Sequence, residues 1–492
     1  MAKTKVKGET NHWLILILVA LAQFMVVLDV SIVNVALPSI QHAFNMSQTS
    51  LQWIVTAYTL TFGGFLLLGG RASDLFGRRK IFLAGLAVFT LASLLAGLSQ
   101  SGGMLIILRA IQGLAGAFMS PAALSIVLVT YREGHERNVA LSVWGAVAAG
   151  GAAVGVLLGG ILTQYLDWRW NFFVNVPVGL IVAYFSMRLL PEHESEAEHN
   201  NLDLPGAILG TGGLMMLVYA LVKAPSMGWT DATSLTYFAI SIIALAAFII
   251  NESKVKYPLM PLHLFKIRNL VGADSMMLFL TAGMFSVFFF TTLYLQEVLG
   301  YTPIKTGVSF LIIPIVIAIV ATNVPRVIQK IGYKPIMIVA PLFVSAGLFY
   351  LSHIPVNGTF WGNVAPGMII MALGMGGTFV AVTIAATSGV PHEESGVASG
   401  LLNTSQQVGG AIGLAVLTGI AASASAEYIK NLGLQGSPTQ DQIAAATVQG
   451  FQNGYLIAST FGVIASLIAI FVIKQGKVSA EDMTPEKMLA GG

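Results

Sequence analysis

Two side chains of opposite charge lie within largely apolar stretches of this sequence. Asp29 lies in AQFMVVLDVSIVNVALPSI, and Arg109 lies in MLIILRAIQGLAGA. Burial away from water favours the protonated form of a carboxyl group, whereas a nearby cation favours the ionised form. If either influence changes when the protein changes conformation, Asp29 can bind a proton in one state and release it in the other. Two alternatives are a fixed structural ion pair and direct contact with a cationic substrate.

The rise of an α-helix, about 1.5 Å per residue, gives the depth of each charge. Counted from the end of its apolar run, Asp29 is about 12 Å deep. Arg109 and Gln112 are about 9 Å and about 14 Å deep, counted from the start of their run. We therefore predict Asp29 and Arg109 at matching depth, which permits contact. Asp274 lies about 9 Å from the opposite boundary and is a separate candidate for proton coupling.

A further group of side chains suits the binding of bulky amphipathic compounds. Amides supply hydrogen bonds, and aromatic rings and methionine supply adaptable apolar contacts. We predict substrate contacts from Gln112, Trp53, Tyr58, Met284, Phe285, Phe288, Asn403, Gln406 and Gln407. Because the surrounding stretches are apolar throughout, each ring is also compatible with packing between helices or against lipid.

The elements that must position these residues are membrane-spanning helices. Hydrophobic residues make up 55% of the 492 residues and charged residues 10%, against about 25% charged residues in soluble domains. Fourteen apolar runs are long enough to cross about 30 Å of hydrocarbon. They cover residues 13–37, 50–70, 79–98, 103–127, 138–163, 170–190, 204–223, 235–251, 268–297, 303–325, 334–353, 361–386, 398–421 and 452–473. The sequence predicts an all-α integral membrane protein.

The distribution of lysine and arginine predicts the orientation of these spans. With the N-terminus in the cytoplasm, twenty of these residues lie on the cytoplasmic side, four lie outside and Arg109 lies within a span. Cytoplasmic loops of membrane proteins are enriched in both residue types. We therefore expect a multi-pass plasma-membrane protein with both termini in the cytoplasm. Of the two long loops, 191–203 is expected to be a mobile acidic linker. Loop 425–455 lies outside, and its part after Pro438 is expected to form a short surface helix.

A weak internal repeat relates the two halves of the chain. In the loops RASDLFGRRK and RVIQKIGYKP, Arg71 of the first matches Arg326 of the second. Gly77 matches Gly332 at the same spacing. Such a repeat indicates two pseudo-symmetric six-helix bundles, with a substrate site between them near the midplane. The predicted units are an N-terminal bundle (1–190), a linker with two inserted helices (191–267), a C-terminal bundle (268–477) and a tail (478–492).

Several motifs resemble those of the major facilitator superfamily, specifically its fourteen-span drug:proton antiporter branch. They are LDVSIVNVALP (28–38), GRASDLFGRRK (70–80), LRAIQGLAGA (108–117), GGAAVGVLLGG (150–160) with DWRWNFFVNVPVG (167–179), and LLNTSQQVGGAIG (401–413). The resemblance covers nearly the whole chain and implies a bacterial exporter that exchanges compounds for protons. Val156 departs from the pattern, because the antiporter motif usually has proline at this position.

The resemblance also implies residues that act in gating. In the family the first loop motif latches the two bundles together in the outward-facing state, although a simple basic turn would also explain it. The residues concerned are Gly70, Asp74, Gly77, Arg78 and Arg79. The Asp74 carboxylate can accept hydrogen bonds across the bundle interface, and the two glycines permit close backbone approach. A second set forms a stripe for close helix packing or sliding, and consists of Gly151, Gly155 and Gly159.

Other classes of function find little support. The chain has no Gly-x-x-x-x-Gly-Lys-Ser/Thr motif for ATP, no cysteine, and no His-Glu-x-x-His motif of a metalloenzyme. Glutamate and histidine alternate at 192–199, a pattern that could bind a divalent metal weakly but fits a solvated linker better. It also lacks the basic, aromatic-rich patch of a nucleic-acid-binding protein. We predict a secondary transporter, not an enzyme, that exports amphipathic, often cationic compounds as a monomer, driven by the proton gradient without a cofactor. Alternatives are export of an endogenous lipid, fatty acid or metabolite, and a non-transporting sensor or scaffold.

Overall fold

A computed structural model of the chain describes residues 12–131, 135–190, 202–228, 230–391, 394–433 and 437–475. Within these ranges the secondary structure is entirely helical, and fourteen helical segments are long and apolar enough to span a membrane. The predicted fold class and number of spans are confirmed. The predictions for the tail and for most of the acidic linker lie outside the described residues.

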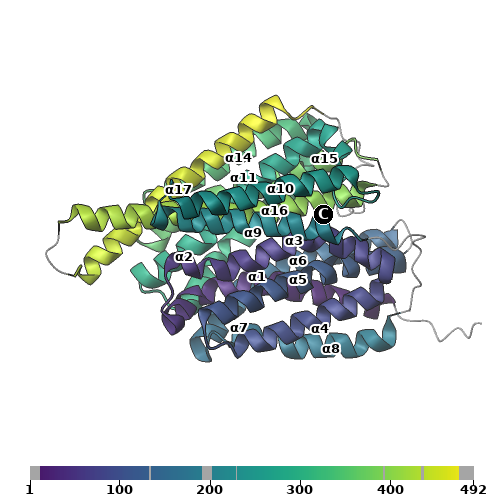
Figure 1. The fold of residues 1–492 in the computed structure, drawn as a ribbon, viewed down its shortest axis with the longest axis horizontal. Coiled ribbons are helices and arrows are strands. Elements are labelled where there is room, and N and C mark those ends of the chain that lie inside the picture. Colours follow the sequence, from purple (N-terminus) through teal and green to yellow (C-terminus); the bar gives the residue numbers. More distant parts are fainter. Residues whose placement is uncertain are drawn as a thin grey trace, which may run out of the picture.

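The first six spans form one bundle, drawn in purple and blue in Figure 1. They are α1 (His12–Phe44), α2 with α3 (Gln48–Leu51 and Trp53–Phe76), α4 (Arg78–Gly97), α5 (Gly102–Thr130), α6 (His135–Tyr165), and α7 with α8 (Trp170–Phe173 and Asn175–Leu189). Helix α1 packs against α5, α6 and α8, and α3 packs along α5. Buried apolar side chains from these helices, such as Phe82 and Met119, form a core of their own.

The last six spans form a second bundle beside the first, drawn in green and yellow in Figure 1. They are α11 (Arg268–Leu293) with the π-helical turn η2 (Tyr294–Val298), α12 (Pro303–Phe310) with α13 (Ile312–Ile331), α14 (Tyr333–Leu351), η3 (Phe360–Val364) with α15 (Ala365–Thr387), α16 (Ser395–Asn431) and α17 (Gln440–Phe471). Helix α16 packs along α11 and α17, and also along α3 of the first bundle.

The predicted short surface helix after Pro438 is wrong, because this segment is the first part of α17. Thr439 caps the helix, and its side chain and that of Gln442 form a capping box. No proline follows before Phe471, so the helix continues without a break. At about 1.5 Å per residue, α16 and α17 are about 55 Å and about 48 Å long and exceed the hydrocarbon thickness. Their hairpin extends beyond the other helices on the left of Figure 1.

The two inserted spans, α9 (Leu204–Met227) and α10 (Ala232–Lys254), pack against each other. Helix α9 also contacts α3 and α16, so the insertion touches both bundles. Most residues of α10 are exposed or half-buried, as expected of a helix that faces lipid. A connector that includes the 3₁₀ helix η1 (Leu262–Lys266) then leads to α11.

Most lysines and arginines lie at one of the two ends of the helical bundles, and a few lie at the other end. The basic face carries Arg71, Arg78, Arg79, Lys80, Arg137, Arg188, Lys254, Lys256, Lys266, Arg268, Arg326, Lys330, Lys334 and Lys474, at or near helix ends. The opposite face carries Arg169, Lys223, Lys305 and Lys430. We use these two names below.

The loops of the internal repeat adopt the same turn. Gly77 joins α3 to α4 with φ of 95°, and Gly332 joins α13 to α14 with φ of 81°. Such backbone angles favour glycine, because a side chain is strained there. Each turn follows the second span of its own bundle, so the structure supports the repeat inferred from the sequence.

Candidate functional site

Asp29 and Arg109 form a buried ion pair inside the first bundle. Asp29 lies on α1 and Arg109 on α5, and the Nη1 atom of Arg109 donates to Oδ2 of Asp29. The two residues are 0% and 1% exposed. The matching depth expected from the sequence is thus realised as direct contact. Charges so far from water need further hydrogen bonds to offset their lost hydration.

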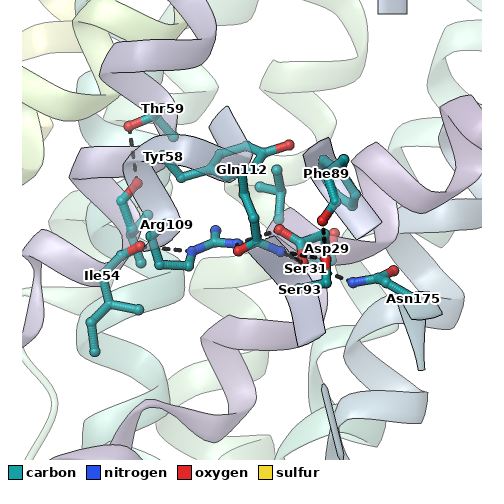
Figure 2. Close-up of polar contacts among 12 residues, drawn as sticks. Asp29, Ser31, Ile54, Tyr58, Thr59, Phe89, Ser93, Arg109, Gln112 and Asn175 are labelled. Atoms are coloured by element: carbon teal, nitrogen blue, oxygen red, sulfur yellow. Dashed lines mark hydrogen bonds and ion pairs between the residues drawn. The ribbon is translucent and has the colours of Figure 1, made fainter. Parts of the chain in front are cut away.

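Neighbouring amides supply these hydrogen bonds (Figure 2). The Oδ1 atom of Asp29 accepts from Nε2 of Gln112 at 3.2 Å and from Nδ2 of Asn175 at 3.0 Å. Gln112 also accepts from Nη1 of Arg109 at 3.0 Å and donates to Oγ of Ser93 at 2.8 Å. The carboxylate therefore accepts hydrogen bonds from three side chains, and all five residues are buried.

The guanidinium group of Arg109 has two further contacts on α3. Its Nε atom donates to the carbonyl oxygen of Ile54 at 3.0 Å. Its Cζ atom lies 4.2 Å from the centre of the Tyr58 ring, within the range of a cation–π interaction. The site thus draws on α1, α3, α4, α5 and α8, as Figure 2 shows. Any change in how these helices pack must alter the surroundings of Asp29.

The glycine stripe of α6 lets that helix pack closely against the part of α1 that carries Asp29. A Cβ atom on Gly151 would lie 3.2 Å from Cβ of Val27, and one on Gly155 would lie 2.7 Å from Cβ of Ser31. On Gly159, a Cβ atom would lie 2.6 Å from the carbonyl oxygen of Ile32. The distances at Gly155 and Gly159 are too short for a side chain, and at Gly151 Val27 would have to shift slightly. The stripe therefore serves close packing between α6 and α1.

The other side of α6 meets the second bundle through two more glycines. A Cβ atom on Gly160 would lie 2.7 Å from the carbonyl oxygen of Pro303, at the start of α12. On Gly307 of α12, a Cβ atom would clash with the carbonyl oxygen of Val156. Helix α6 therefore lies between the Asp29 helix and the second bundle. The sequence motif contained Gly160, but its spacing alone did not mark this contact.

Polar contacts also join the bundles on the opposite face. His42, near the end of α1, pairs with Glu297 of η2 at 2.8 Å. The neighbouring Gln296 donates from Nε2 to the carbonyl oxygen of Val35 at 2.9 Å. Together with the glycine contacts, these interactions hold the ends of α1 and α6 against η2 and α12. The two bundles are closed against each other at this face.

Three of the residues predicted to bind substrate lie in the first bundle. Gln112 and Tyr58 are fully buried and belong to the ion-pair site. Trp53 is half-buried and packs against Tyr219 of α9, with 6.2 Å between ring centres. Trp53 also packs against an apolar cluster that includes Ala411 and Ala415 of α16. Contact of these three side chains with substrate stays a prediction.

The residues of the second bundle lie on α11 and α16. Met284, Phe285 and Phe288 are half-buried, and Phe288 stacks on Phe310 with 5.3 Å between ring centres. The α16 amides of Asn403, Gln406 and Gln407 are also half-buried. A Cβ atom on Gly63 of α3 would lie 2.6 Å from that of Gln407, which places this amide at the seam between the bundles.

Asp274 lies on α11 toward the basic face and takes no part in the Asp29 site. It is 6% exposed, and neither carboxyl oxygen has a hydrogen-bond partner among the described residues. An ionised carboxylate without partners is costly to bury. The structure thus keeps Asp274 as a second candidate for proton binding, separate from Asp29.

Asp74 and Arg79 of the loop motif contact other residues of the first bundle, whereas Arg71 contacts Tyr257 of the connector. Asp74 is exposed and lies 3.9 Å from Nε of Arg78, and Arg79 donates to the carbonyl oxygen of Met187 on α8. The predicted close approach at Gly70 is wrong. Its Cβ atom would lie 3.8 Å from Pro121, which is ordinary contact, and Gly69 makes the close approach.

Sequence reasoning missed Asn175 and Ser93 as members of the site. Both are polar residues within spans, and the motif DWRWNFFVNVPVG contains Asn175. The depth count applied to Arg109 places Asn175 about 8 Å from the start of its span, at a similar level. That signal was available, whereas Ser93 differs in no visible way from other serines and threonines of the spans.

Residues 19–414 match the Major Facilitator Superfamily. The chain belongs to this superfamily. It is 39% identical to the puromycin resistance protein of Streptomyces alboniger, over 97% of this chain and 94% of that protein. The cephamycin export protein of Amycolatopsis lactamdurans is 37% identical, over 86% of each chain.

A solved structure, that of a bacterial homologue of the human lysosomal transporter Spinster, has the same fold. Its TM-score is 0.70 at 14% identity, over 95% of this chain and 97% of that one. The resemblance found in the motifs is therefore confirmed. The chain is a multi-pass membrane transporter and not an enzyme.

Proposed function

We propose that this transporter exports amphipathic small molecules by alternating access, as a single chain, and that Asp29 couples export to the entry of protons. The names of its relatives, which denote resistance to or export of antibiotics, support the export of such compounds. The observation that carries the coupling is the buried Asp29–Arg109 pair, held by side chains from several helices. By the positive-inside rule, the basic face is cytoplasmic.

In the arrangement described, the outer ends of the bundles are closed and Asp29 is shielded from water. Opening this side requires α6 and α1 to part from α12 and η2. Because α6 packs directly on the Asp29 segment of α1, this movement also shifts α1 against α5. Weakening the contact with Arg109 favours the protonated carboxyl group, and restoring it favours release of the proton. Each proton that moves down 100 mV supplies about 2.3 kcal/mol.

The proposed substrate surface lies at the seam where α11 and α16 face the first bundle. The half-buried amides of Asn403, Gln406 and Gln407 offer hydrogen bonds there, and Met284 and Phe285 offer apolar contact. A surface of few polar groups among apolar side chains suits amphipathic compounds of varied shape. Cations gain further from the aromatic rings.

The test uses purified protein in liposomes with an imposed pH gradient. Wild type should move an amphipathic dye against its concentration gradient. Protons cross in the opposite direction, so the compartment that the dye leaves should become more acidic. Asp29→Asn should abolish this gradient-driven transport while dye still exchanges down its own gradient. The matched control is Asp167→Asn, a half-exposed acid that pairs with Arg169 at the opposite face and should transport normally.

Two results would contradict the proposal. Undiminished gradient-driven transport by Asp29→Asn would remove the coupling role of this residue. Failure of wild type to move any of a panel of amphiphiles would remove the proposed substrate class. In that case an endogenous substrate or a non-transporting role would explain the chain better.

A further inference from the structure

A second buried acidic group lies in the two inserted helices, outside the Asp29 site. Asp203 precedes α9 and caps it, because its Oδ1 atom accepts from the backbone N–H of Gly206 at 2.9 Å. Glu252 lies in the last turn of α10. The two residues are 4% and 3% exposed. We call Asp203 and Glu252 the acid pair.

The two carboxyl groups of the acid pair converge on one point. A Cβ atom on Gly206 would clash with Oδ2 of Asp203 and would lie 2.6 Å from Oε1 of Glu252. Oδ2 of Asp203 and Oε1 of Glu252 thus lie beside the same point and are close neighbours. The bare backbone of Gly206 provides the space in which both oxygens meet.

The hydrogen bonds around the acid pair leave one oxygen without a donor. Asp203 accepts from Nδ2 of Asn251 at 2.9 Å and 2.8 Å, in addition to the N–H of Gly206. Glu252 accepts from the backbone N–H of Met260 at 2.8 Å through Oε2. Its Oε1 atom, which faces Asp203, has no donor among the described residues. Two ionised carboxylates are both acceptors only, so a proton between them would satisfy this atom.

Nearby cations do not neutralise the acid pair. Within the described ranges, no lysine or arginine forms an ion pair with either carboxyl group. Besides the acid pair, the charged side chains of the adjoining elements are Arg71 and Asp74 on α3, Lys223 on α9, Lys254 on α10, and Lys256 and Lys266 in the connector. The connector also carries His263, which pairs with Glu394. Arg71 and Lys256 lie over the ring of Tyr257, at 5.1 Å and 5.3 Å from its centre. Two like charges this close and this buried are strongly disfavoured without a counter-charge.

We propose that the acid pair is a proton-binding site that holds one shared proton at neutral pH. The proton joins the start of α9 to the end of α10, and Glu252 in turn holds the connector through Met260. When the proton is lost, the two carboxylates repel each other, and this repulsion loosens the junction.

The junction between α9, α10 and the connector is in contact with the first bundle. Leu259 of the connector packs with Leu68 of α3 and Ala207 of α9 in one small apolar cluster. Arg71, at the start of the loop motif, lies over Tyr257 of the same connector. The acid pair is therefore placed to convey the pH at the basic face to α3 and to the loop between α3 and α4. This site and its test do not depend on Asp29 or on the transported compound.

Glu252→Gln is the decisive variant, because glutamine mimics the protonated acid. Its amide nitrogen can donate to Asp203 while its amide oxygen still accepts from Met260. Infrared difference spectra between about pH 6 and about pH 9 should show wild type losing the C=O stretch of one protonated carboxyl group. Glu252→Gln and Asp203→Asn should both lack this one component, whereas any signal from Asp29 or Asp274 should be the same in all three proteins. Asp231→Asn, which neutralises the exposed carboxylate at the other end of α10 and keeps the helix cap, should retain the component.

Thermal unfolding of the purified protein supplies an independent readout. The folded protein holds a proton that the unfolded chain has released, so wild type should lose stability as the pH rises. The unfolding temperature of Glu252→Gln should therefore exceed that of wild type by a margin that grows with pH, and Asp231→Asn should show no such trend. A margin that does not change with pH, or an infrared signal as large in both acid-pair variants as in wild type, would overturn the proposal.

Discussion

Replacing Arg109 with methionine removes the cation of the buried pair and keeps a long, flexible side chain in its place. The carboxylate of Asp29, which is 0% exposed, then has no counter-charge. Removing one partner of a buried ion pair costs about 3–5 kcal/mol. Asp29 can limit this cost by taking up a proton. An ordinary aspartate ionises near pH 4, so holding the proton at pH 7 costs about 1.4 kcal/mol per pH unit, or about 4 kcal/mol.

We therefore expect Arg109→Met to be destabilised by about 4 kcal/mol at pH 7. The loss should shrink by about 1.4 kcal/mol for each unit of pH decrease toward pH 5, because the folded variant binds a proton that the unfolded chain does not. The double variant Asp29→Asn/Arg109→Met has no charge to bury. It should regain most of the stability and lose this dependence on pH.

Unfolding of the purified variants in detergent, followed by circular dichroism over a series of pH values, measures both effects. Wild type and Asp29→Asn complete the double-mutant cycle. Equal stability of Arg109→Met and wild type at pH 7 would refute the reasoning. A destabilisation that is the same at every pH, or that persists in the double variant, would show that packing and not charge is responsible.

Two further predictions concern helix packing and the movement of the bundles. Gly69→Ala should destabilise the protein, because its Cβ atom would clash with the carbonyl oxygen of Ala117, whereas Gly70→Ala should be tolerated. Equal unfolding temperatures for the two variants would contradict the packing. The chain has no native cysteine. In the double variant His42→Cys/Glu297→Cys, a short thiol cross-linker between the bundles should stop dye transport. If the linker is cleavable, reduction should restore transport. The control Asp167→Cys/Arg169→Cys links residues of one bundle and should transport normally, while transport by the linked His42/Glu297 variant would argue against opening at this face.

The number and class of the membrane spans were predictable because they depend on local properties of the chain. A helix in lipid satisfies its backbone hydrogen bonds within itself, so length and hydrophobicity decide whether a segment spans. Even the short run at 235–251 proved to be a full span, α10. The part of α17 that precedes residue 452 was not predicted. Its first turns are polar and lie beyond the hydrocarbon, where hydropathy does not indicate a helix.

Depth along a helix could also be read from the sequence, but rotation about its axis could not. Asp29 and Arg109 were matched in depth by counting residues, and the contact between them depended on how α1 and α5 turn toward each other. Neighbouring positions on a helix point about 100° apart. For this reason the motif drew attention to Gly70, whereas the residue that faces α5 is Gly69. The same uncertainty left Asn175 unnoticed.

The linear sequence thus determines that this chain is a fourteen-span membrane protein with charges buried in its first bundle, because each span forms from its own residues. Tertiary packing alone decides which buried groups meet. It joins Asp29 to Arg109 with amides from α5 and α8, and it brings Asp203 against Glu252 across the insertion. These partners are 80 and 49 residues apart in the chain, and only the rotation and close approach of whole helices bring such distant side chains within hydrogen-bonding distance.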